Sequence, residues 1–124
     1  MIAGIGTDMI EVERVAEKIG KESGFRELVF SKNEIDYCEP KANKFEHYAA
    51  RFAAKEAFLK ALGTGWLNGT AFNEIEITHD ENGKPMINLL GNTALVVASM
   101  NLVNFSVSLT HLKSIASAVV IIEK

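Results

Sequence analysis

The chain has 124 residues, of which 48% are hydrophobic and 23% are charged, and its net charge is -3. This length fits one domain spanning residues 1–124, and the acidic balance argues against a general nucleic-acid binder. No apolar run approaches the roughly 18 residues that a membrane span needs, and the start of the chain lacks the pattern of a signal peptide.

The chain holds one cysteine, Cys38. A single cysteine forms no internal disulfide, and neither CxxC nor HExxH spacing is present to suggest a zinc site. This usage fits a reducing compartment, so we expect a cytoplasmic protein. Since no base is predicted beside Cys38, a small buried side chain is favoured over a nucleophile.

The first half of the chain is predicted to be mainly helical. The expected elements are a strand at Ile2–Thr7 with Asp8 at its end, helices at Glu11–Gly20 and Phe25–Phe30, and a long helix at Lys44–Leu62 ended by Gly63. Ser31, followed three residues later by Glu34, is the signature of a capping box, which predicts a further turn through Tyr37.

Strands dominate the second half. The expected elements are a strand at Asn73–Thr78, a turn at Asn82-Gly83, a return strand through Ile87 and Leu89, a helix at Thr93–Asn101, and strands at Phe105–Thr110 and Ala116–Ile122. Helices and strands are mixed without regular βαβ alternation. The class is therefore α+β, with a mainly antiparallel sheet packed on the long central helix.

The long helix carries a carboxylate in a predicted apolar arc. Glu56 is expected inside this arc, while Arg51 and Lys55 point elsewhere. The arc consists of Phe45, Ala49, Phe52 and Leu59. A buried carboxylate needs a partner, and Lys60, one turn later, offers an internal ion pair. On this helix alone, an ion pair and a functional role for Glu56 are equally favoured.

Asp8 is the second candidate carboxylate. It follows Gly4 and Gly6, which leave room for another group close to the backbone. Taken alone, Asp8 fits a helix N-cap or turn better than a site. Together with Glu56, however, it could hold one Mg²⁺, which takes one or two protein carboxylates and fills its shell with water and phosphate oxygens.

Three further features allow two interpretations each. Gly63-Thr64-Gly65 fits a helix C-cap better than a phosphate loop, because no complete phosphate motif surrounds it. His111 alone suggests a structural or surface histidine. Arg14, Lys18 and Lys21 form a basic stripe on an acidic protein, which is more often a solvated face than a docking site.

Several motifs taken together resemble one family, the bacterial holo-acyl-carrier-protein synthases, which are 4′-phosphopantetheinyl transferases. The motifs are Gly4-Ile5-Gly6-Thr7-Asp8 with Glu11 and Arg14, the segment RFAAKEAF at Arg51–Phe58 continuing through Lys60–Gly65, the turn Asn82-Gly83-Lys84-Pro85, and Val107–His111 before the last strand. The resemblance spans nearly the whole chain, and the RFAAKEAF segment is its most specific part.

The resemblance implies an α+β fold and a homotrimer with active sites in the clefts between subunits. It also implies that Asp8 and Glu56 are Mg²⁺ ligands. The residues that it implies for the coenzyme A site are Lys60, Gly63, Gly65, Pro85, His111 and Arg51.

The implied reaction is attack by a serine of an acyl carrier protein on the β-phosphate of coenzyme A, which supports fatty acid biosynthesis. Asp8, Glu56 and Lys60 would be its catalytic residues, with Glu56 or a metal-bound water as the base. The basic stripe would then bind the acidic carrier protein. Two rival interpretations are a non-enzymatic coenzyme-binding module and a structural trimer with an internal Glu56–Lys60 pair.

Overall fold

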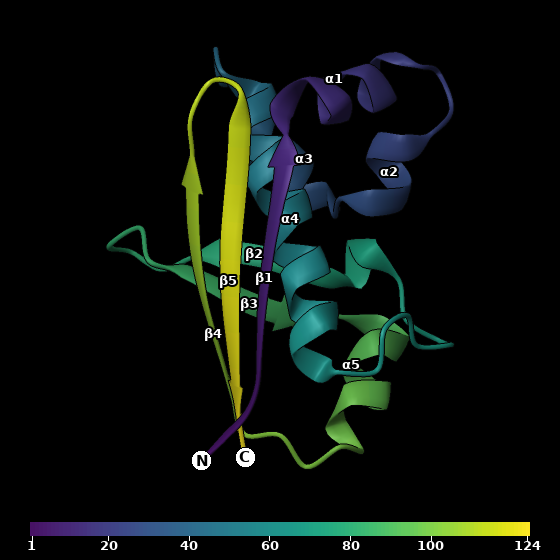
Figure 1. The fold of residues 1–124 in the computed structure, drawn as a ribbon. Helices are drawn as coiled ribbons and strands as arrows, with labels where there is room; N and C mark the ends of the chain where they lie inside the picture. The colour runs from purple at the N-terminus through teal and green to yellow at the C-terminus, as the bar shows by residue number, and fades with distance from the viewer.

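A three-stranded antiparallel sheet packs one face on a long helix, as the computed structural model of residues 1–124 shows (Figure 1). The sheet has the strand order β1-β5-β4. Its strands are β1 (Ile2–Glu11), β4 (Asn104–His111) and β5 (Ile115–Glu123), and the helix is α4 (Lys44–Leu62). The predicted α+β class and the bounds of the long helix are confirmed.

A two-stranded hairpin crosses the other side of α4. It consists of β2 (Ile75–His79) and β3 (Pro85–Leu89), preceded by a 3₁₀ turn at Phe72–Glu74 and followed by α5 (Gly91–Ala98). The predicted turn is confirmed, since Gly83 has a φ of 83° and the Asp80 carboxylate accepts hydrogen bonds from the backbone N–H groups of Asn82 and Lys84.

Three short helices cover one end of α4: α1 (Val12–Gly20), α2 (Phe25–Val29) and α3 (Lys32–Cys38) (Figure 1). The capping box at the start of α3 is confirmed. The Ser31 hydroxyl accepts from the N–H of Glu34, and the Glu34 carboxylate accepts from the N–H of Ser31. Glu34 is also buried, so its carboxylate must satisfy its remaining lone pairs inside the protein.

Two glycines of β1 set how closely the sheet approaches α4. A Cβ added to Gly4 would collide with the carbonyl oxygen of Ala61, and one added to Gly6 would collide with that of Ala57. The group that the glycines admit is thus the backbone of α4. This contact fixes the side chains of β1 relative to those of α4.

The apolar core surrounds α4 on both sides. One cluster includes Phe58, Ile75 and Val120, and the other includes Phe30, Tyr48 and Cys38. Burying a side chain such as Phe58 contributes about 1.5–3 kcal/mol. Cys38 is fully buried, and burial raises the pKa of its thiol to about 11, so it is a core residue and not a nucleophile.

Several predicted boundaries are wrong. The strand expected at Asn73–Thr78 begins only at Ile75, because Asn73 and Glu74 belong to the 3₁₀ turn. Asp8 does not end the first strand, because β1 continues to Glu11, where it still pairs with Ile115 of β5. The fifth helix spans Gly91–Ala98 rather than residues 93–101. None of the helices has the length and apolar character required to cross a membrane.

Candidate active site

Asp8 and Glu56 come together from β1 and α4. Asp8 pairs with Ala118 in the register of β1 and β5, and its carbonyl oxygen accepts a 3.1 Å hydrogen bond from the Ser117 hydroxyl. Because side chains alternate along a strand, Asp8 projects from the same face as Gly4 and Gly6, toward α4. The half-buried Glu56 lies on that helix.

The two carboxylates influence each other electrostatically. The pKa of Glu56 is raised above its ordinary value, first by burial and second by the negative charge of Asp8, while Lys60 and Lys18 act in the opposite direction. The charged form of a carboxylate in this position is therefore disfavoured. A cation shared with Asp8 would stabilise the charged form and so offset both the burial of Glu56 and its repulsion by Asp8.

Lys60 lies at the same place but pairs with Asp8. Its ammonium donates to the Thr7 carbonyl oxygen at 3.0 Å and to Asp8 Oδ1 at 3.1 Å. The Lys60 side chain is 56% exposed, so this is not an internal ion pair. The internal Glu56–Lys60 pair that the helix pattern offered is therefore not formed.

The predicted orientation of two other residues of α4 is wrong. Arg51 and Lys55, which were expected to point away from the core, are 2% and 0% exposed. The reason is that α4 is covered by both sheets and by α1 and α3, so most of its circumference is buried. Glu56, by contrast, faces a gap in this cover and remains half-buried.

The donor set around Asp8 and Glu56 suits Mg²⁺. Both residues offer hard carboxylate oxygens, and no cluster of three or more His, Cys, Asp or Glu residues is present to favour a zinc-like site. Mg²⁺ keeps several waters or phosphate oxygens and needs few protein ligands. The two residues fit such an ion.

A separate pocket of about 240 Å³ gathers Arg51, Pro85 and His111. Its other lining residues are Tyr37, His47, Ala50, His79, Gly83 and Leu109. Arg51 donates to the carbonyl oxygen of His47 at 3.2 Å and stacks over the Tyr37 ring at 4.3 Å. Its Nε atom is buried without a partner, which leaves a donor directed to no protein group.

The charge of this pocket favours an anion. Burial, followed by the nearby Arg51 charge, lowers the pKa of His47 to about 4 and also lowers that of His79. His111 Nδ1 lies 2.9 Å from Glu46 Oε1. Arg51 is thus a cation beside His47 and His79, which resist a further positive charge, and an anionic ligand would stabilise this group.

The two clusters do not form one site within a single chain. Neither Asp8, Glu56 nor Lys60 lines the Arg51 pocket. On α4, Arg51 and Glu56 are five residues apart, which is roughly 7.5 Å along the axis and roughly 140° around it. The sequence grouped these residues together, whereas the structure places them on different sides of the helix.

Comparison with known proteins identifies the family. The model of the 4′-phosphopantetheinyl transferase superfamily matches residues 4–116. The chain belongs to this superfamily. Among curated relatives, the holo-[acyl-carrier-protein] synthase of Cytophaga hutchinsonii is 49% identical, covering 100% of this chain and 99% of the relative. That of Solibacter usitatus is 42% identical, covering 99% of both chains.

Solved structures of the same enzymes share the fold. Holo-[acyl-carrier-protein] synthase from Neisseria meningitidis superposes with a TM-score of 0.91 at 30% identity, covering 100% of both chains. The enzyme from Bacillus anthracis, in complex with CoA (3′,5′-ADP), gives a TM-score of 0.81 at 33% identity, covering 100% of this chain and 98% of that one.

The other candidate residues of this transferase lie as follows. Gly63 is the C-cap of α4 in the left-handed conformation, with a φ of 76°, and Gly65 has a φ of 65°, so the C-cap interpretation is confirmed. Both glycines lie just beyond Lys60 in an exposed loop. Whether this loop contacts coenzyme A stays a prediction.

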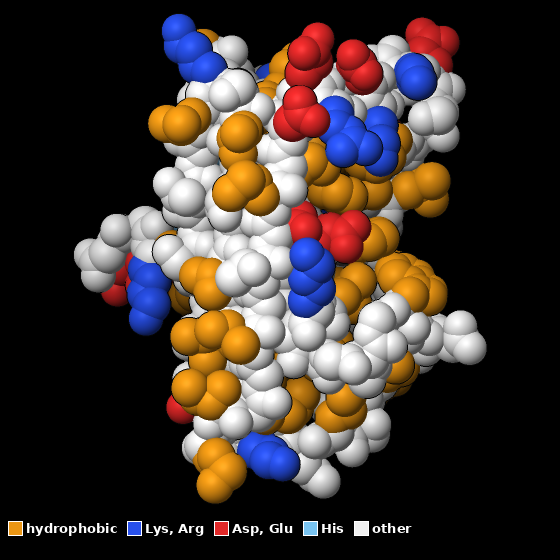
Figure 2. All heavy atoms as spheres, in the orientation of Figure 1, with side chains coloured by type: hydrophobic (Ala, Val, Ile, Leu, Met, Phe, Trp, Pro, Cys, Tyr) orange, Lys and Arg blue, Asp and Glu red, His pale blue; other side chains and the backbone are white.

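The basic stripe is exposed on the α1 side of the molecule. Arg14, Lys18 and Lys21 are all exposed, but only Lys18 leans toward α4, with its ammonium 5.6 Å from the Phe25 ring and 5.9 Å from the Phe52 ring. Figure 2 shows basic and acidic side chains over α1, and a smaller group of both signs below it, midway along this face. Lys18 therefore connects the stripe to the surroundings of Glu56.

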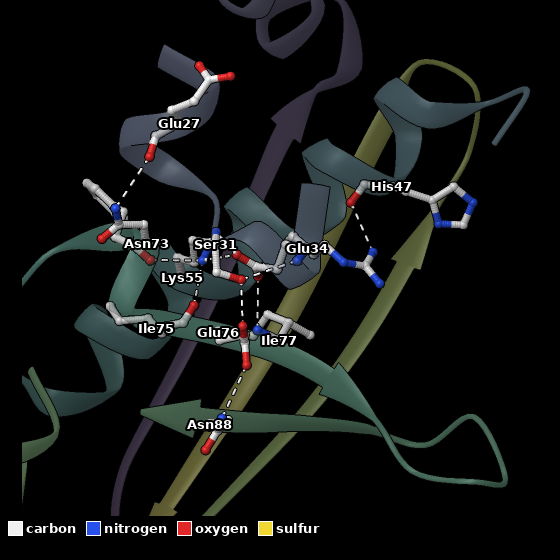
Figure 3. Close-up of polar contacts among 12 residues, drawn as sticks. Glu27, Ser31, Glu34, His47, Lys55, Asn73, Ile75, Glu76, Ile77 and Asn88 are labelled. Carbon is white, nitrogen blue, oxygen red and sulfur yellow. Dashed lines mark hydrogen bonds and ion pairs between the residues drawn. The ribbon is translucent and has the colours of Figure 1, made fainter. Parts of the chain in front are cut away.

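Sequence reasoning missed one charged group, the buried network around Lys55. Its members include Glu34, Ser31 and Glu76, drawn in Figure 3. Glu34 is expected to form a capping box, and Lys55 is expected to point away from the apolar arc, so the sequence does not join the two residues. The available signal was a lysine among alanines, with Ala53 and Ala54 before it and Ala57 after it.

Proposed function

We propose that this chain transfers the 4′-phosphopantetheine group from coenzyme A to a serine of an apo-acyl carrier protein and thereby supports fatty acid biosynthesis. Its curated relatives are holo-[acyl-carrier-protein] synthases over their full lengths, and related structures contain coenzyme A or 3′,5′-ADP. The single observation that carries the proposal is the meeting of Asp8, Glu56 and Lys60 at one half-open place.

The reaction needs charge neutralisation more than covalent catalysis. The serine oxygen forms a bond to the β-phosphorus, the bond from that phosphorus to the bridging oxygen breaks, and 3′,5′-ADP leaves. Asp8 and Glu56 would hold Mg²⁺, which supplies positive charge to the diphosphate and its leaving oxygen when bound. Lys60, exposed and loosely held by Asp8, would turn its ammonium to the same phosphates.

The serine must lose its proton during the attack. Glu56 is the carboxylate that we assign to accept it, because no protein group donates a hydrogen bond to Glu56, whereas Asp8 already accepts one from Lys60. An acceptor within hydrogen-bond reach of the hydroxyl is the geometric requirement for such a role. The carrier-protein serine would therefore approach on the Glu56 side of the pair.

The pocket of Arg51, Pro85 and His111 would bind a second part of coenzyme A. Its guanidinium cation, Arg51, suits a phosphate group. Since this pocket faces away from Asp8 and Glu56, we propose a homotrimer in which one copy supplies the pocket and the next supplies the carboxylates. The open face of the sheet exposes Ile5 and Met9, at 63% and 68%, as an interface between copies would require.

The proposed cytoplasmic location rests on Cys38, a lone free thiol. The proposed docking of the carrier protein rests on the basic stripe beside the carboxylate pair. Acidic partners recognise a local positive patch even on a protein whose net charge is negative.

The test is incubation with coenzyme A, Mg²⁺ and an apo-carrier protein, followed by intact mass measurement. We expect the carrier protein to gain one phosphopantetheine group, and a chelator to abolish the gain. Asp8→Asn and Glu56→Gln should stay folded and lose roughly 10²-fold or more in turnover. Binding of coenzyme A without any transfer would instead identify a binding module.

A further inference from the structure

We propose that the buried network of Lys55, Glu34 and Glu76 positions the coenzyme A pocket around Arg51. The proposal rests on the proposed function, in that it takes this pocket to bind part of coenzyme A. The three residues are positioning residues and touch no substrate, since they are 0%, 1% and 2% exposed.

Lys55 uses all three of its N–H donors inside the protein. Its ammonium donates to Glu34 Oε1 at 2.7 Å, to the Phe72 carbonyl oxygen at 2.8 Å and to the Ile75 carbonyl oxygen at 2.5 Å (Figure 3). One side chain of α4 therefore fixes α3 and both ends of the 3₁₀ turn that leads into β2.

Glu34 extends the connection to the hairpin. Its Oε1 also accepts from the N–H of Ser31 at 2.9 Å, and its Oε2 accepts from the N–H of Ile77 at 2.9 Å. The second bond joins α3 directly to the backbone of β2. Every oxygen of this buried carboxylate is thus engaged by a different element.

Glu76 completes the set by reaching β3. Its Oε2 accepts from the Ser31 hydroxyl at 2.6 Å, and its Oε1 accepts from the side-chain amide of Asn88 at 3.2 Å. Figure 3 shows the hydrogen bonds running from α3 through β2 to β3. Four elements are held by one hydrogen-bonded group.

The same four elements supply most of the walls of the pocket, and β4 adds Leu109 and His111. Arg51 lies one turn before Lys55 on α4, Tyr37 lies three residues after Glu34 on α3, and His79 lies two residues after Ile77 on β2. Pro85 begins β3, three residues before Asn88. A shift of any of these elements would therefore move one wall of the pocket relative to the others.

Stability alone does not account for a buried ion pair. Removing two charges from water costs several kcal/mol, and replacing such a pair by apolar side chains is often neutral or stabilising. Apolar side chains cannot, however, reproduce the five hydrogen bonds of Lys55 and Glu34, which set the distances and orientations between elements. Misplacing a binding group by about 1 Å can cost roughly 10²-fold in rate.

The decisive variant is the double substitution Glu34→Gln and Lys55→Met, which removes both charges of the ion pair together, so that neither member is left as an unpaired ion. Thermal unfolding checks that it folds, and steady-state kinetics and calorimetric titration with 3′,5′-ADP follow. We expect the KM for coenzyme A to rise, and the affinity for 3′,5′-ADP to fall, about tenfold or more, with kcat at saturating coenzyme A within about twofold.

The matched control is Lys32→Met with Asp36→Asn. Both residues of this control pair lie on α3, as Glu34 does, and their charged atoms are 2.8 Å apart, but the pair is exposed. Its removal should change neither constant. If the buried double variant does not fold, Glu76→Gln gives the same readout, because it keeps the shape of the side chain and leaves the Lys55–Glu34 pair intact.

A folded buried variant with wild-type KM and wild-type 3′,5′-ADP affinity would overturn the proposal. So would an equal effect of the exposed control pair. Failure of the proposed function is distinct from both outcomes, since the wild-type protein itself would then transfer nothing.

Discussion

Lys60 donates a hydrogen bond to Asp8 Oδ1 across 3.1 Å, although on α4 it lies one turn from Glu56. An exposed ion pair of this kind contributes about 1 kcal/mol or less to stability. The ammonium can therefore leave Asp8 for a phosphate with little loss. A functional role and a purely structural role for Lys60 therefore predict different experimental results.

Lys60→Ala should leave the protein as stable as the wild type and weaken its ligands. We expect the free energy of unfolding to change by about 1 kcal/mol or less, and the affinity for coenzyme A and 3′,5′-ADP to fall roughly tenfold. Thermal unfolding and calorimetric titration measure the two effects. A lowered melting temperature with unchanged affinities would show that Lys60 only neutralises its neighbours.

Gly6→Ala should destabilise the protein strongly. The new methyl group would meet the carbonyl oxygen of Ala57, and neither backbone can yield, because β1 is paired with β5 and α4 is buried. Overpacking of this kind costs about 1–3 kcal/mol. Gly20→Ala is the control, since a methyl group there meets nothing within 4 Å. Equal denaturation midpoints for the two variants would contradict the close contact.

His47 should make the ligand-free protein lose stability as the pH falls. Its pKa is about 4 in the folded protein and 6.5 in its ordinary environment, so the unfolded chain binds the additional proton first. The contribution of His47 is complete above pH 6.5 and is lost progressively between pH 6.5 and 4. The charged and titratable groups that act on this imidazole are the same in wild type and in a His47 variant. They are Arg51, His111, Lys41 and Glu46.

The measurement is the melting temperature of wild type and of His47→Gln across this range. The carboxylates titrate in both proteins, so the difference between the curves reports His47. We expect the wild type to lose more on acidification than the variant. Parallel curves would mean that burial does not oppose protonation of this imidazole.

The sequence predicted most of the fold because its strongest signals are local. The bounds of α4 follow from helical spacing and from Gly63, and the capping box of α3 follows from two residues three apart. The carboxylate pair was also predicted. Each of its two residues lies within a short family motif that can be recognised without knowing the fold.

Features that depend on distant segments were not predicted. The strand β1 runs past Asp8 because β5, more than a hundred residues later, supplies partners as far as Glu11. Lys55 was placed outside because helical periodicity assumes one buried side, whereas α4 is covered on several. The bond of Lys55 to Glu34 joins residues 21 apart and leaves no local pattern.

The proposed division of the site between subunits can be tested by mixing inactive variants. His111→Ala alters the pocket, and Glu56→Gln alters the carboxylate pair, so each protein alone should be nearly inactive. In a cyclic trimer assembled at random from equal amounts, about a quarter of the clefts combine an intact pocket with an intact pair. We therefore expect co-expressed variants to regain about a quarter of wild-type turnover.

Light scattering on the same preparation gives the mass. A monomer that is active, or a mixed preparation no more active than the two variants added together, would contradict a site shared between copies.

Arg14→Glu should impair recognition of the carrier protein and leave coenzyme A binding intact. Arg14 is exposed on α1 and forms no ion pair, whereas Lys18 packs near two aromatic rings, so Arg14 is the cleaner position for charge reversal. Because the partner is expected to be acidic, the variant should raise the KM for the carrier protein several-fold. Added salt should act similarly on the wild type, since exposed charges are screened over about 8 Å at physiological ionic strength.

Lys124→Glu, the same charge change at the far end of the sheet from α1 (Figure 1), is the control and should leave this KM unchanged. If Arg14→Glu and Lys124→Glu behave alike, the carrier protein docks elsewhere and the stripe is a solvated surface.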